Sequence, residues 1–340
     1  MYKLLRSILF LLPAEKAHKT ALSLFEIGLN IPILSSLLNK IYAPSNHNSI
    51  ELFGLQFKNR VGLAAGFDKN GDHIEAMSVL GFGFIEVGTV TPKPQMGNDQ
   101  PRLFRLKADQ ALINRMGFNN NGVDYLVDRL KKVKRSDVVI GGNIGKNKNT
   151  ANEDAISDYI ISFNKLHDHV DYFVINVSSP NTPNLRALQD KEPLTALLQS
   201  VVAENERYAN PRPILLKIAP DLSWSQIDDV IDIVLSVGVD GIIATNTTIN
   251  RAGLQTAVST ISEIGNGGLS GVPMQDRSTE VIRYIHDKTA GAITIIGVGG
   301  IHDAASAKEK IEAGASLIQL YTGFVYEGPA IVRKLIAATS

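Results

Sequence analysis

The sequence of 340 residues contains no cysteine. Disulfide bonds, cysteine-ligated zinc, cysteine-bound iron–sulfur clusters and thiol nucleophiles are therefore excluded, and we expect no metal site. Neither sign of charge is in excess, because 34 Lys and Arg residues balance 34 Asp and Glu residues. This balance disfavours nucleic-acid binding and acidic disorder, so a small ligand is the better expectation. The length suits one large α/β barrel or two smaller domains.

Long hydrophobic runs are also absent. No apolar stretch approaches the roughly 18 to 20 residues that span a bilayer, so we expect no transmembrane helix. Lys3 and Arg6 precede the apolar residues 8–12 in the manner of a secretion signal. That run is too short, however, and Pro13 follows it without a small-residue cleavage pattern, so we expect no export.

Residues 1–42 have apolar positions at helical spacing, interrupted near Pro13 and Pro32. This pattern predicts two or three short amphipathic helices. Two interpretations stay open: a helical cap packed on the main domain, or an apolar face lying on a membrane surface, helped by Lys3 and Arg6. The segment 43–46 has the composition of a linker, so we divide the chain into 1–42 and 43–340.

From residue 50 onward a hairpin-like pair over 50–57 is followed by alternating strand and helix patterns. The predicted strands are 61–65, 84–88, 138–144, 171–177, 213–218, 240–245, 293–298 and 316–321. The predicted helices lie near 70–80, 121–133, 152–167, 194–209, 223–237, 273–288, 303–313 and 328–338. Eight units with strands apolar on nearly every residue predict an α/β fold of the (β/α)8 TIM-barrel type rather than a doubly wound sheet. Two long connections, 89–120 and 246–272, are expected to be functional.

Active sites of such barrels lie at the carboxyl ends of the strands, and here nearly every predicted strand ends in a polar residue or glycine. The segment 174–186 is the most informative, because it carries the end of a buried strand into an irregular loop and contains two prolines and three asparagines. Its hydroxyl and amide groups suit a small, planar, polar ligand. Ser179 is the candidate for the chemistry, and the alternative is a hydrogen-bonded turn.

The last two predicted strands are followed by Gly299-Gly300 and Thr322-Gly323, with a helix start near Pro329. These loops are typical of the phosphate site of barrels, and Gly268 to Gly271 can close over it; the alternative is that the glycines only allow tight turns. A phosphate site among asparagines, threonines and lysines fits flavin mononucleotide better than a dinucleotide, since no Gly-x-Gly-x-x-Gly follows the first strand.

Two other motifs compete with this interpretation. The glycine-rich segment 141–147 is one residue short of a P-loop and lacks the Ser or Thr that binds magnesium. Lys217 can form a Schiff base in an aldolase, or it can set its charge against an electron-rich cofactor ring.

Seven segments of the chain match the motifs of one protein family in the same order along the sequence, and together they are specific to that family. They are 64–69, 114–120, 176–181, 217–220, 245–248, 267–271 and 297–301. In these segments the chain resembles the dihydroorotate dehydrogenases, within them the quinone-dependent, membrane-associated class. The resemblance implies a barrel with one FMN per subunit that oxidises (S)-dihydroorotate to orotate in de novo pyrimidine biosynthesis. A membrane quinone would be the final electron acceptor.

The resemblance also implies residue roles. Ser179 would be the general base. Substrate contacts would come from Lys69, Asn114, Arg115, Met116, Gly117, Phe118, Asn176, Asn181, Asn246 and Thr247. FMN contacts would come from Ala65, Gly66, Phe67, Asp68, Lys69, Thr89, Asn143, Asn176, Lys217, Thr245, Gly271, Gly300, Tyr321 and Thr322. His18, Arg105 and Tyr321 would line the quinone path.

A serine hydroxyl is a poor base unless its proton can leave, so we hypothesise that Thr182 relays that proton through a water. The resemblance places the enzyme peripherally on the cytoplasmic face of the inner membrane, with residues 1–42 as the quinone access, and no iron–sulfur partner subunit is expected. Two alternatives stay open: a Schiff-base aldolase that uses Lys217, and a non-catalytic membrane protein that binds a phosphate ligand.

Overall fold

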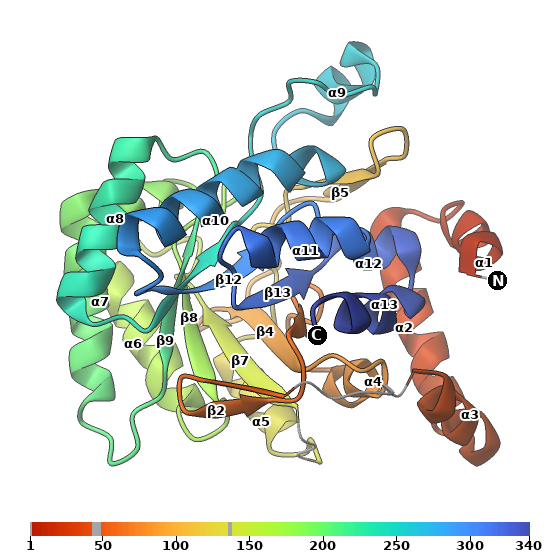
Figure 1. Ribbon diagram of the computed structural model, residues 1–340, viewed down its shortest axis with the longest axis horizontal. Coiled ribbons are helices and arrows are strands. Elements are labelled where there is room, and N and C mark those ends of the chain that lie inside the picture. Colours follow the sequence, from red (N-terminus) through yellow and green to blue (C-terminus); the bar gives the residue numbers. More distant parts are fainter. Residues whose placement is uncertain (1, 43–48, 135–137) are drawn as a thin grey trace.

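The computed structural model describes residues 2–42, 49–134 and 138–340 (Figure 1). Eight parallel strands close into a barrel in the order β10-β12-β13-β3-β4-β7-β8-β9, which confirms the predicted (β/α)8 architecture. The predicted linker over 43–46 lies outside the described residues, so the boundary between the two segments stays a prediction.

The barrel strands match the predicted ranges within two residues at each end. They are β3 (Val61–Leu63), β4 (Phe84–Val90), β7 (Val139–Ile144), β8 (Tyr172–Asn176), β9 (Ile214–Ile218), β10 (Gly241–Ala244), β12 (Thr294–Val298) and β13 (Leu317–Leu320). The helices after them also overlap their predictions. They are α4 (Ile74–Val79), α5 (Val123–Leu130), α6 (Ala155–Leu166), α7 (Lys191–Asn205), α8 (Trp224–Val237), α10 (Gln275–Thr289), α11 (Ala304–Glu312) and α13 (Ala330–Ala338).

Large side chains fill one end of the barrel. Phe84 lies against Gly62, where a Cβ atom would come within 2.3 Å of the Phe84 ring. The predicted hairpin, β1 (Ile50–Leu52) and β2 (Leu55–Phe57), covers this end, and Phe57 meets the Phe84 ring edge to face at 5.4 Å. Because the barrel strands are parallel, their polar carboxyl ends all meet at the opposite end.

The two long connections pair with each other. They contribute β5 (Leu103–Leu106), β6 (Ala111–Asn114) and β11 (Gly268–Gly271), which form an antiparallel sheet in the order β11-β6-β5. The rest of the second connection holds a short helix, α9 (Val258–Ile264), and a turn of 3₁₀ helix, η2 (Val272–Met274), follows β11. A second 3₁₀ turn, η1 (Leu185–Gln189), lies between β8 and α7. The sequence indicated functional loops here but not this sheet.

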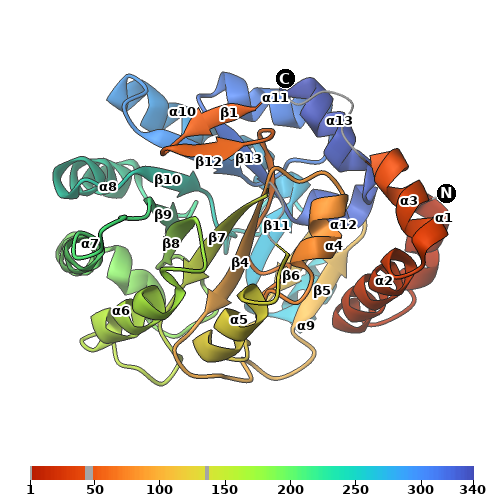
Figure 2. The same ribbon diagram turned by 90° about the horizontal axis from the view of Figure 1, so that it is seen from below.

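The amino-terminal helices are α1 (Tyr2–Leu9), α2 (Ala14–Leu29) and α3 (Pro32–Tyr42), as the proline-interrupted pattern predicts. They lie along one side of the barrel (Figures 1 and 2), where α1 contacts α12 (Thr322–Glu327) and α2 contacts α4 and β5. In the described part of the chain, no single helix is long and apolar enough to cross a membrane; α2 and α3 qualify only as a pair, by length and composition, and that pair is bent by 109°.

Candidate active site

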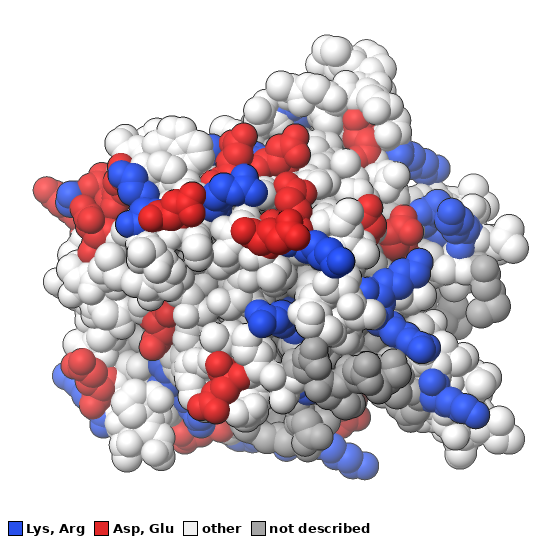
Figure 3. All heavy atoms as spheres, viewed as in Figure 1, with Lys and Arg blue, Asp and Glu red and all other residues white. Residues whose placement is uncertain are grey.

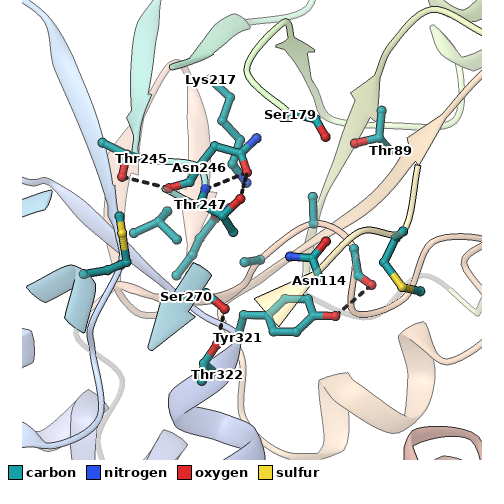
Figure 4. A pocket seen from close by; sticks show the side chains of 18 of the residues that line it. Thr89, Asn114, Ser179, Lys217, Thr245, Asn246, Thr247, Ser270, Tyr321 and Thr322 are labelled. Carbon is teal, nitrogen blue, oxygen red and sulfur yellow. Dashed lines mark hydrogen bonds between the residues drawn. The ribbon is translucent and has the colours of Figure 1, made fainter. Parts of the chain in front are cut away.

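A cavity of about 1040 Å³, including the solvent at its mouth, lies at the carboxyl ends of the strands (Figure 4). Ser179, Lys217 and Gly300 come from three separate strand ends, and all three line it. Most of the other predicted site residues line it as well: Ala65, Gly66, Lys69, Thr89, Asn114, Met116, Gly117, Phe118, Asn176, Asn181, Thr245, Asn246, Thr247, Gly271, Tyr321 and Thr322. The sequence therefore located this cavity.

A chain of side-chain amides forms one wall. The oxygen of Asn143 accepts hydrogen bonds from the Thr89 hydroxyl at 2.5 Å and from Nδ2 of Asn176 at 3.2 Å. The oxygen of Asn176 in turn accepts from the Ser178 hydroxyl at 3.1 Å and from Nδ2 of Asn246 at 3.3 Å. Asn143 itself does not line the cavity, so it acts on the wall by orienting Thr89 and Asn176.

Ser179 lies on the loop after β8, and its oxygen accepts the Asn181 N–H at 3.3 Å. The Asn181 side chain donates to Oδ1 of Asn114 at 3.0 Å, which ties this loop to the end of β6. Nearby Thr182 is buried, and within the described residues its hydroxyl has no hydrogen-bond partner. A buried hydroxyl in this state is available to a water, as the relay hypothesis requires.

Two lysines face the cavity. Nζ of Lys69 donates to the Gly66 carbonyl at 2.9 Å, and burial lowers the Lys69 pKa to about 8. Burial also lowers the pKa of Lys217, while the Glu86 carboxylate, whose Oε1 lies 3.9 Å from Nζ, works in the opposite direction. The cavity thus has two lysine amines whose charged form burial disfavours, and Glu86 favours the charged form of Lys217.

Glycines form a close-packed cradle beneath the loops after β12 and β13. A Cβ atom on Gly300 would lie within 2.5 Å of Gln275, and one on Gly323 would lie 2.0 Å from the Ile301 carbonyl oxygen. The hydroxyls of Ser270 and Thr322 are 2.8 Å apart above this cradle. The helix start expected near Pro329 is confirmed by α13, which begins at Ala330. An additional short helix, α12, begins at Thr322, so the cradle leads directly into a helix. Packing of these loops against Gln275 and the Ile301 carbonyl therefore requires glycine, and the same loops line the cavity at the position where barrels bind phosphate.

Comparison with known proteins agrees with the motifs. The family model for dihydroorotate dehydrogenase matches residues 48–339. A dihydroorotate dehydrogenase (quinone) from Christiangramia forsetii is 57% identical over 339 residues, covering 98% of this chain and 97% of the relative. The chain belongs to the dihydroorotate dehydrogenase family. Another family member, the quinone enzyme from Cellvibrio japonicus, is 48% identical over 341 residues, covering 99% of this chain and 97% of the relative.

Solved dihydroorotate dehydrogenases also share the fold. The Eimeria tenella enzyme in complex with ferulenol superposes with a TM-score of 0.82 at 36% identity, covering 95% of this chain and 90% of that one. The ligand-free Eimeria tenella enzyme gives a TM-score of 0.80 at 38% identity, covering 90% of this chain and 92% of that one.

Some residues that the family resemblance implicates do not line the cavity. Arg115 points away from it: its guanidinium donates to the backbone oxygens of Ile264 and Pro101 and lies 4.7 Å from the Phe104 ring centre. Asp68 is buried, and its carboxylate accepts the backbone N–H groups of residues 72 and 73. Both side chains brace loops next to the cavity, so their predicted ligand contacts stay predictions.

The predicted quinone-path residues fall into two groups. The His18 ring meets the Phe67 ring edge to face at 4.7 Å, and Phe67 meets the Tyr321 ring at 5.5 Å. Burial, with the charge of Lys69 as the next cause, lowers the His18 pKa to about 4, so this imidazole is neutral near pH 7 and its Nε2–H donates to the Phe67 carbonyl at 3.0 Å. Phe67 therefore lies between the amino-terminal helices and the cavity rather than in its lining.

Arg105 lies apart from the aromatic series of His18, Phe67 and Tyr321. It donates to the Leu12 carbonyl at 2.9 Å and lies over the Phe10 ring at 4.4 Å, so it holds the turn between α1 and α2.

The sequence analysis assigned no contact to six lining residues, which are Ala64, Ser270, Met274, Val298, Ile301 and Gln319. It also missed Glu86, which lies within β4 with no exposed surface. Glu86 and Gln319 are polar residues inside otherwise apolar strands, which was a usable signal in the sequence. Met274 carries no such signal.

Proposed function

We propose that this chain oxidises (S)-dihydroorotate to orotate, with FMN as the hydride acceptor and a membrane quinone as the final electron acceptor. This places it in de novo pyrimidine biosynthesis. The observation that carries the proposal is the meeting of Ser179, Lys217 and the Gly300 cradle in one cavity of a chain that belongs to this family.

The residues present fit FMN. The loops at Gly299-Gly300 and Thr322-Gly323 line the cavity at the rim where barrels bind phosphate, and the cavity volume of about 1040 Å³, counted with its mouth, suits a cofactor-sized ligand. When bound, FMN accepts a hydride from the substrate and passes electrons on to the quinone. Lys217 supplies positive charge at the cavity wall, which favours an electron-rich ring there.

Ser179 is the proposed base. Oxidation forms the C5–C6 double bond of orotate, so C5 loses a proton while C6 loses a hydride. The Ser179 hydroxyl takes the C5 proton and gives up its own. The buried hydroxyl of Thr182, which has no partner among the residues the structure describes, supports a relay of that proton through a water.

Substrate binding needs donors for a planar ring and positive charge for its carboxylate. Lys69 supplies the charge, and Asn114, Asn181 and Asn246 place amide groups around the same cavity. An ionised carboxylate strengthens hydrogen bonds from such donors. These residues therefore select a flat, carboxylated, polar ring.

The amino-terminal helices support a peripheral position on the membrane. Their exposed apolar side chains are Leu4, Leu5, Ile8, Leu24, Ile27, Ile33, Leu34, Leu37 and Ile41. Residues 1–42 carry five basic and two acidic residues, and Lys and Arg gather along this edge of the molecule in Figure 3. An apolar face rimmed by positive charge suits an anionic lipid surface, and we assign that surface to the cytoplasmic face of the inner membrane. Residues 1–42 then form the quinone-access segment beside the catalytic segment 43–340.

The absorbance spectrum of the purified protein tests the proposal. A flavin enzyme is yellow and bleaches when dihydroorotate is added. An aldolase that uses Lys217 is colourless and is trapped covalently by borohydride with its carbonyl substrate, and a phosphate-binding membrane protein does neither. A colourless preparation that also fails to take up added FMN would refute the proposed function.

A further inference from the structure

A buried carboxylate lies directly behind the cavity wall. Glu86 has no exposed surface, and its Oε1 and Oε2 accept hydrogen bonds from Nδ2 of Asn143 at 2.7 Å and from Nε2 of Gln319 at 2.6 Å. Its third partner is Lys217, with Nζ 3.9 Å from Oε1. A buried charge is costly unless such partners compensate it. Two of the three partners, Lys217 and Gln319, line the cavity, whereas Glu86 does not, so Glu86 acts on a ligand through its partners.

Lys217 depends on Glu86 for its charge. Burial favours the neutral amine and lowers the Lys217 pKa, and within the described part of the chain Glu86 is the charged group that raises it. Among the described residues, Glu86 is also the carboxylate recorded within 4 Å of this ammonium. The other titratable group facing Glu86 is Tyr172, which stays neutral because burial, then Glu86 and Asp171, raise its pKa well above the usual value. The protonation of Lys217 is therefore set by burial, which favours the neutral amine, and by one carboxylate, which favours the charged form.

Glu86 also fixes the direction of the amide chain. A carboxylate can only accept hydrogen bonds, so Asn143 must turn its NH2 group toward Glu86. The Asn143 oxygen then faces Thr89 and Asn176 and accepts from both. A glutamine at position 86 would both donate and accept, and this constraint would be lost.

We propose that Glu86 is a positioning residue for the flavin side of the cavity: its carboxylate keeps Lys217 protonated and sets the orientation of the Asn143 amide. The inference rests on the proposed FMN site. Without the carboxylate, Lys217 releases its proton, and the cavity loses the positive charge that favours an electron-rich flavin ring. Glu86 thereby favours the reduced, electron-rich form of the bound flavin without contacting it.

Glu86→Gln in the FMN-loaded enzyme tests this with sulfite, an anion that adds to the flavin ring and reports positive charge beside it. We expect sulfite affinity to fall at least about tenfold, equivalent to about 1.4 kcal/mol, and the flavin midpoint potential to become more negative. Lys217→Met should act in the same direction, and the double variant should lose little more than either single variant. Unchanged or tighter sulfite binding, or additive losses, would overturn the proposal.

Two comparisons separate charge from packing. The loss of sulfite affinity in Glu86→Gln, expressed as a ratio to the wild-type affinity at each pH, should become smaller on acidification because acid restores the Lys217 proton. An equal loss of affinity at every pH would contradict the proposal. Glu204→Gln, the same change in the ion pair of Glu204 and Arg207 at the end of α7, should leave sulfite affinity at the wild-type value because Glu204 does not line the cavity.

A second variant covers a folding failure. If Glu86→Gln does not fold, Glu86→Asp keeps the charge but moves it away from Lys217, and sulfite affinity should again fall; wild-type affinity then overturns the inference. Wild-type protein that binds no FMN would instead refute the proposed function itself.

Discussion

At the scale of single residues, Ser179 carries the strongest prediction. Its hydroxyl lies at the cavity wall and accepts one backbone N–H, so Ser179→Ala removes the proposed base while leaving the cradle intact. We expect FMN to stay bound and flavin reduction by dihydroorotate to fall by about 10² to 10⁴, the usual contribution of general base catalysis. Stopped-flow absorbance measures this step. Turnover at the wild-type rate would remove Ser179 from the role of base.

Thr182 allows a separate test of the relay. Thr182→Val keeps the shape of the side chain and removes a buried hydroxyl that has no partner among the described residues. Flavin reduction should slow by more than orotate binding weakens, because a relay acts on the proton and not on the bound ring. The measurements are the reduction rate and the orotate Kd. Equal losses in both would argue for a packing role.

Lys69 gives the cavity a pH dependence. Burial lowers the Lys69 pKa to about 8, so the group is charged below that pH and becomes neutral above it. A carboxylated ligand loses its ionic partner as the pH rises, so orotate should bind most tightly below pH 8 and progressively more weakly above it. Titration of orotate across pH 6.5 to 9.5 measures the trend, which Lys69→Gln should abolish. A flat profile for the wild type would contradict the assignment.

At the scale of elements, one ion pair docks α2 onto the catalytic segment. Glu15 accepts from Arg102 at 2.7 and 3.2 Å, and Arg102 also donates to the Met96 and Asn98 carbonyls at 2.6 and 2.8 Å. Burial acts to raise the Glu15 pKa, but the hydrogen bond and charge of Arg102 outweigh it and lower the pKa. The contribution of this ion pair to docking is therefore present above the usual pKa of a glutamate and is lost on acidification.

Glu15→Gln should weaken this docking by about 1.5 to 3 kcal/mol, the range for a hydrogen bond to a charged group. Amide hydrogen exchange over α2 measures the change as lost protection. Glu26→Gln is the matched control on the same helix, because its pair with His73 is more exposed and should cost less. A larger loss in the control would rule out Glu15 as the main anchor.

Sequence reasoning failed on elements whose partners are far away in the chain. Strands β6 and β11 are four residues each and meet across 154 positions, as the Asn114 contact with Gly268 illustrates. So short a strand carries no reliable periodicity, and only its distant partner makes it a strand. The barrel strands were predictable because burial on both faces makes each one apolar by itself.

At the scale of the whole molecule, the barrel topology explains which site residues the sequence could locate. Ser179, Lys217 and Gly300 all follow or end barrel strands, so counting strands places them at one rim. The direction of a side chain is set by neighbours that counting does not provide, and Arg115 turns toward Ile264 for that reason. Glu86 was missed because its importance arises only when Lys217 and Gln319 approach from other strands.

The arrangement of α1 to α3 beside the barrel leads to the last prediction. His18 on α2 touches Phe67, and Phe67 touches Tyr321 at the cavity, so the helices connect the apolar outer face to the proposed flavin site. Deleting residues 1–42 should strongly reduce electron transfer to a lipid-soluble quinone while sparing reduction of a soluble dye, since only the quinone needs an apolar approach. Steady-state rates with the two acceptors measure this, and FMN content checks that the barrel still folds. Equal loss with both acceptors at full FMN occupancy would show that the segment supports the barrel and does not select the acceptor.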